Sequence, residues 1–146
     1  MCIRDSNLYE NLKLKNFSIL PGSEIKLLKG LELGCSGIIT ATCNVTAELS
    51  RQVYDDFFAG KKQLYNDKLC DVRSTFDKYN LISGLHTLCA QNDNMYKNIL
   101  PPLSLLNQND EEELMNRLKD LKCKRNSSKS YSQVQIIRIY LFRCLL

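Results

Sequence analysis

Two short apolar runs, each bounded by turn residues, constrain the fold of this chain more than any other feature. Residues 17–20 (Phe-Ser-Ile-Leu) form a short, mostly apolar run that stops at Pro21-Gly22, which predicts a buried strand that ends in a turn. Residues 37–41 form a second run of this kind and are rich in β-branched side chains. We therefore expect two short buried strands in the first half of the chain.

A helical pattern follows each of these runs. Ser23 can cap a helix that carries leucines at helical spacing and ends at Gly34. After the second run, Thr46 is expected to cap another amphipathic helix, which Gly60 closes. Strand, helix, strand, helix with short connections is the pattern of parallel βα units.

The second half of the chain carries helical patterns alone. Amphipathic helices are expected over residues 64–79 and 81–91, and Pro101-Pro102 predicts an extended segment after them. A last helix is expected to begin with Asn109 as its cap and Glu112 completing a capping box. This half is therefore predicted to be all-helical.

The net charge of +4 is unevenly distributed along the chain. All 16 acidic residues but only 14 of the 20 basic residues precede Lys122, so residues 1–121 carry −2 and residues 122–146 carry +6. A slightly acidic body argues against nucleic-acid binding. The basic segment 122–146 is interpreted as a disordered or foreign tail, with a basic amphipathic membrane anchor as the alternative.

The cysteines give no sign of a metal site. The chain has 7 cysteines, which are scattered without a CxxC pair, and one histidine, His86. Zinc sites need cysteine and histidine ligands at close spacing, so we expect no metal. Without a secretory signal or an apolar run of membrane-spanning length, we expect a cytoplasmic protein with reduced thiols and no membrane partner.

Several motifs taken together resemble one enzyme family. Three segments carry the resemblance: residues 21–24 (Pro-Gly-Ser-Glu), residues 34–45 (Gly-Cys-Ser-Gly-Ile-Ile-Thr-Ala-Thr-Cys-Asn-Val), and Leu100-Pro101-Pro102. With Ala59-Gly60 between them, this order resembles the end of the dihydrodipicolinate synthase and N-acetylneuraminate lyase family of pyruvate-dependent class I aldolases. The resemblance covers about residues 2–121.

The resemblance implies an α/β fold, namely the C-terminal fragment of a TIM (β/α)8 barrel. Residues 1–60 would hold its last two or three βα units, residues 61–121 a C-terminal helical domain, and residues 122–146 the basic tail. In the family no cofactor is needed, the small-molecule partner is the 2-oxo acid pyruvate, and the whole protein is a homotetramer.

The resemblance also places Arg4 at a position that decides the chemistry. Residues 2–6 read Cys-Ile-Arg-Asp-Ser, where the family has Gly-Ile-Lys-Asp-Ser and its lysine forms a Schiff base with pyruvate. A Schiff base needs an amine that can lose its proton, whereas arginine stays protonated. We therefore expect this chain to be inactive and interpret residues 1–6 as non-native.

Five further residues are implied as substrate-binding because pockets of such barrels lie at the carboxyl ends of the strands. They are Gly22 and Ser23 at the turn after the seventh strand, Ile39 through its backbone carbonyl, and Thr40 and Asn44 at the end of the eighth strand. Simpler roles stay open, since Ile39 suits a barrel core, Gly22 a turn and Asn44 a helix cap.

The resulting hypothesis is a fragment of a lyase that condenses pyruvate with an aldehyde, or cleaves the product, through a Schiff base. Two alternatives stay open. One is a small helical interaction module with a basic tail, and the other is a pseudo-enzyme in which Arg4 is native.

Overall fold

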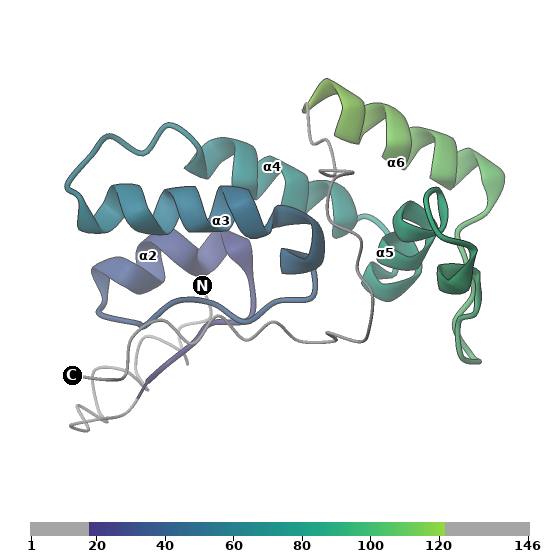
Figure 1. The fold of residues 1–146 in the computed structure, drawn as a ribbon, viewed down its shortest axis with the longest axis horizontal. Helices are drawn as coiled ribbons and strands as arrows, with labels where there is room; N and C mark the ends of the chain where they lie inside the picture. Colours follow the sequence, from purple (N-terminus) through teal and green to yellow (C-terminus); the bar gives the residue numbers. More distant parts are fainter. Residues whose placement is uncertain (1–17, 122–146) are drawn as a thin grey trace.

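Residues 18–121 are described by the computed structural model, and their longest helix is α3 (Cys43–Phe58). A short 3-10 helix, η1 (Glu24–Lys26), leads into α2 (Leu27–Glu32), and α2 and α4 (Asn66–Phe76) both pack against α3. A second group contains α5 (Leu81–Ala90), the 3-10 helix η2 (Asn94–Lys97) and α6 (Gln108–Asp120). Figure 1 shows the first group at one end of the molecule and α5 with α6 at the other.

Helix α4 joins the two groups because its apolar side chains enter two clusters. Leu69 belongs to the first cluster, with Leu27, Leu31 and Val53 from α2 and α3. Val72 and Phe76 belong to the second, with Leu85, Leu114 and Leu118 from α5 and α6. Helix α4 therefore packs against the helices of both groups and links the two clusters.

The two predicted strands are wrong within the described residues, which contain helices and extended segments but no strand. The segments 18–21 and 35–40 lie side by side, since Ser36 N donates to Ile19 O at 3.0 Å and Ile39 N donates to Pro21 O at 3.1 Å. A regular strand presents every second residue to the same neighbour, whereas these donors are three residues apart. Three residues of segment 35–40 thus span two residues of segment 18–21. Gly37, with a φ of 150°, lies within this longer stretch and lets the backbone accommodate the additional residue.

The first-half helices are confirmed, although one start was misplaced. Residues 24–32 are helical, with Ser23 at the N-cap position but without a side-chain cap bond. Helix α3 begins at Cys43, so the prediction that Thr46 caps it is wrong. The Thr46 side chain is buried inside the first turn, where its hydroxyl oxygen lies 3.0 Å from the Thr42 carbonyl oxygen.

The second half is helical, as predicted, but its boundaries and its last cap differ. Helix α4 is shorter than the expected 64–79, and α5 matches the expected 81–91 closely. Asn107, not Asn109, caps α6, because its side chain accepts from Asp110 N at 3.0 Å. Pro101-Pro102 lies in a turn closed by Leu103 N and Leu100 O at 3.1 Å, so the extended segment was also wrong.

Gly60 closes α3 in the way that the sequence predicted. Its φ is 64°, its N–H bonds Phe57 O at 3.1 Å, and Lys61 N bonds Asp56 O at 2.8 Å. These two bonds form a Schellman motif, which requires a left-handed residue at this position.

Replacing Gly60 by alanine is therefore expected to lower the free energy of unfolding by about 1–2 kcal/mol, the cost of left-handed backbone for a residue with Cβ. No heavy atom lies within 4 Å of the position that the new Cβ would take, so a steric clash adds nothing. Urea unfolding followed by circular dichroism measures this change. An unchanged midpoint would contradict the role of the left-handed cap.

None of the helices in residues 18–121 is both long enough and apolar enough to cross a membrane. Arg4 and the basic tail, residues 122–146, lie outside the described residues.

Candidate functional site

The structure brings two predicted site residues together at the end of the extended segments. Ile39 N donates to Pro21 O at 3.1 Å, and a Cβ built on Gly22 would lie 3.8 Å from the Ile39 carbonyl oxygen. The Ile39 side chain is 51% exposed, so it does not occupy a core within the described residues. The turn at Gly22 and the backbone of Ile39 thus form one edge of the molecule.

Ser23 and Asn44 lie near this edge but make local contacts. The Ser23 carbonyl accepts from Lys26 N at 3.0 Å and starts η1. Asn44 is exposed, and its Nδ2 donates to Ala41 O at 2.8 Å. Because Thr42 occupies the N-cap position of α3, the proposed capping role of Asn44 is wrong.

A fully buried carboxylate, Glu24, lies directly behind this edge. Its Oε1 accepts from the Thr42 hydroxyl and from Thr46 Oγ1, the latter at 2.9 Å. Its Oε2 accepts from Thr40 Oγ1 at 3.0 Å. A buried charge needs such partners, and three hydroxyls supply them here.

Arg73 on α4 completes the network and compensates the charge. Its Nη1 lies 3.0 Å from Thr40 Oγ1 and 3.5 Å from Glu24 Oε2, while its other guanidinium nitrogens bond Asp77 at 2.8 Å. The bond to Asp77, with the charges of Asp77 and Glu24, raises the pKa of Arg73 above its usual range. Thr40 thus has its hydroxyl engaged by both Glu24 and Arg73.

The sequence did not predict this network, although Glu24 lies in the Pro-Gly-Ser-Glu motif of residues 21–24. Glu24 and Thr40 are 16 residues apart, and Glu24 and Arg73 are 49 apart. The signal that could have revealed the network is the threonine spacing at 40, 42 and 46, which places three hydroxyls around the start of one helix.

The side chains around this edge offer no activated nucleophile. Burial, and secondly the charge of Glu24, raise the pKa of the Cys43 thiol, so it stays protonated and unreactive at neutral pH. His86 lies on α5, far in sequence from the residues of this edge. Its Nδ1 lies at hydrogen-bond distance, 2.8 Å, from the Tyr96 carbonyl oxygen. Residues 18–121 also contain no group of three or more ligating side chains placed to hold a metal.

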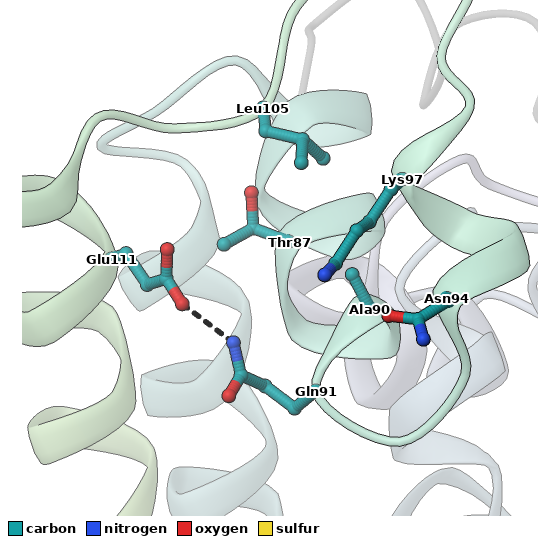
Figure 2. Close-up of a pocket in the computed structure, with 7 residues that line it drawn as sticks. All are labelled: Thr87, Ala90, Gln91, Asn94, Lys97, Leu105 and Glu111. Atoms are coloured by element: carbon teal, nitrogen blue, oxygen red, sulfur yellow. Dashed lines mark hydrogen bonds between the residues drawn. The ribbon is translucent and has the colours of Figure 1, made fainter.

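A separate pocket lies in the second helical group, between α5, η2 and α6 (Figure 2). Thr87, Lys97 and Glu111 are among the residues that line it. None of the residues that the sequence predicted for substrate binding lines this pocket.

The chain belongs to the dihydrodipicolinate synthetase family, which matches its residues 1–121. No curated protein matches the chain.

Solved structures of this family share the fold of the described residues. Dihydrodipicolinate synthase from Aquifex aeolicus is 20% identical, with a TM-score of 0.71 over 82% of this chain and 42% of the enzyme. The Bacillus anthracis enzyme DapA-2 is 17% identical, with a TM-score of 0.70 over 79% of this chain and 41% of its own.

YagE, a prophage protein of this family from Escherichia coli K12 solved in complex with pyruvate, is 21% identical, with a TM-score of 0.65 over 74% of this chain and 38% of its own. The chain thus spans about two fifths of the length of these proteins. At these identities the likeness establishes the fold alone, as part of the barrel proteins of this family.

Proposed function

We propose that this chain is the C-terminal part of a lyase that joins pyruvate to an aldehyde, or cleaves the product, through a Schiff base. The observation that carries the proposal is the family match over residues 1–121, combined with a span of about two fifths of the related enzymes. In the proposed parent protein, residues 1–60 end the barrel and residues 61–121 form the helical domain. The parent needs no cofactor and assembles as a homotetramer.

The edge formed by Gly22 and Ile39 is proposed to border the pyruvate pocket of the parent protein. The Ile39 carbonyl faces the substrate there, with Gly22, Ser23 and Asn44 around it. Since the Thr40 hydroxyl is already engaged by Glu24 and Arg73, Thr40 contributes through its backbone. The proximity of Gly22 to the Ile39 carbonyl supports this arrangement.

Arg4 makes the chain itself inactive in this proposal. Its guanidinium stays protonated at neutral pH and is a poor nucleophile, so it forms no Schiff base with a ketone.

Borohydride trapping with pyruvate tests the proposal. The protein to use is the uninterrupted gene product, with lysine at the position of Arg4, and the readout is a mass gain of one reduced pyruvate adduct on that lysine. The matched control is the same full-length protein carrying arginine there, which should gain no mass.

If the uninterrupted gene product with lysine gains no mass, the lyase proposal fails. If the genomic sequence carries arginine at the position of Arg4, the pseudo-enzyme hypothesis replaces the lyase proposal. Sequencing the genomic DNA on both sides of this reading frame decides which residue is native.

A further inference from the structure

The pocket between α5, η2 and α6 has the volume of a small-molecule site and a mostly polar lining. Its volume is about 400 Å³, within the range of about 300–1,000 Å³ typical of ligand pockets. Because its lining residues are separate from the Gly22 and Ile39 edge, an inference about it does not rest on the proposed lyase function.

One side of the pocket presents a cation and a side-chain amide. Lys97 extends its ammonium group from η2 into the pocket (Figure 2), and it pairs with no carboxylate among residues 18–121. The Asn94 side-chain amide lies beside it and bonds no described residue. Thr87 is almost fully buried, and its Oγ1 accepts from Leu106 N at 3.0 Å, so it shapes the wall of the pocket. Lys97 and Asn94 together suit a carboxylate.

The opposite side of the pocket presents an oriented anion. Glu111, in the first turn of α6, faces Lys97 across the pocket in Figure 2. Its Oε1 accepts from Gln91 Nε2 at 2.5 Å, which holds the carboxylate in place and leaves Oε2 for a ligand. This side therefore suits an ammonium group.

The charges of Lys97 and Glu111 cancel, which decides the class of ligand. A simple anion would gain attraction at Lys97 but meet repulsion from Glu111, and a simple cation would meet the reverse. A zwitterion satisfies both groups. Leu105 and Ala90 add a small apolar area to the mostly polar lining.

We propose that this pocket binds a free α-amino acid, with L-leucine as the probe. Its carboxylate lies against Lys97 and Asn94, its ammonium group against Glu111, and part of its side chain against Leu105 and Ala90.

Titration of the full 146-residue chain with L-leucine, followed by ¹⁵N NMR of the side-chain amides of Gln91 and Asn94, tests the proposal. We expect saturable shifts with a dissociation constant in the millimolar range. Two matched probes each lack one charge, 4-methylpentanoate without the ammonium group and 3-methylbutylamine without the carboxylate. Each should bind at least about tenfold more weakly, a factor that corresponds to one lost charge contact.

Two substitutions should weaken L-leucine binding by about tenfold or more. Lys97→Met keeps the unbranched stem and removes the charge, and Glu111→Gln keeps an acceptor for Gln91. Lys119→Met and Glu112→Gln, on α6 and outside the pocket lining, are the matched controls and should bind as the parent chain does. The proposal is overturned by an absence of saturable shifts up to about 20 mM. It is equally overturned by 4-methylpentanoate binding as tightly as leucine, or by unchanged affinity in both pocket variants.

Discussion

Replacing Glu24 by alanine is expected to lower the free energy of unfolding by about 3–5 kcal/mol, the usual cost of removing one partner from a buried charged network. The carboxylate is fully buried and accepts from the hydroxyls of Thr40, Thr42 and Thr46. Its loss would leave the hydroxyls of Thr40 and Thr42 without their carboxylate acceptor. It would also remove one of the two carboxylates that face Arg73, which keeps Asp77. Urea unfolding monitored by far-UV circular dichroism measures the effect.

Two comparison variants separate the effect of losing the buried hydrogen-bond network from the effect of losing any carboxylate charge. Glu24→Gln keeps the volume and one acceptor oxygen, so we expect a smaller loss of about 1–3 kcal/mol. Glu32→Ala removes an exposed carboxylate whose only ion pair within residues 18–121 is the surface contact with Lys29 at 3.0 Å, and should change stability by less than about 0.5 kcal/mol. If Glu24→Ala unfolds at the same urea concentration as Glu32→Ala, the network does not stabilise the fold.

The helices were predictable from the sequence because their signals are local. Leucines at helical spacing and the glycines at 34 and 60 mark where α2 and α3 lie and end. Caps were less predictable, since Asn107 and Asn109 are both suitable residues and only the backbone conformation selects Asn107.

The predicted strands failed because a strand depends on its neighbours as well as on its own residues. The run at 37–41 has strand composition, yet Gly37 shifts the spacing of its hydrogen bonds against segment 18–21. The Glu24 network and the pocket were not predictable either. Each joins residues from elements far apart in the chain, as Arg73 and Glu24 show.

Replacing Phe76 by alanine is the second change with a large expected effect. Phe76 is fully buried in the cluster of α4, α5 and α6, and an ideal Cβ on Gly84 would lie only 3.3 Å from its ring. The ring therefore lies directly against the backbone of α5. Its removal leaves a cavity that the helices cannot close fully, which costs about 3–5 kcal/mol.

The matched control is Phe58→Ala, the same substitution at a ring that is 63% exposed. Phe58 contacts Tyr54 and Phe57 with ring centroids 4.7 and 5.3 Å away, so a loss of about 0.5–1 kcal/mol is expected. Thermal unfolding of both variants beside the parent chain gives the comparison. Equal losses for the two variants would show that the second cluster does not form in solution.

The thermal transition of Phe76→Ala also shows whether the two helical groups unfold together. Phe76 lies two turns after Leu69 on α4, and Leu69 packs in the cluster of α2 and α3. Because one helix supplies side chains to both clusters, loosening the second should lower the stability of the first. We therefore expect a single cooperative transition at a lower temperature. Two separate transitions would instead mean that the two clusters unfold independently, although α4 contributes side chains to both.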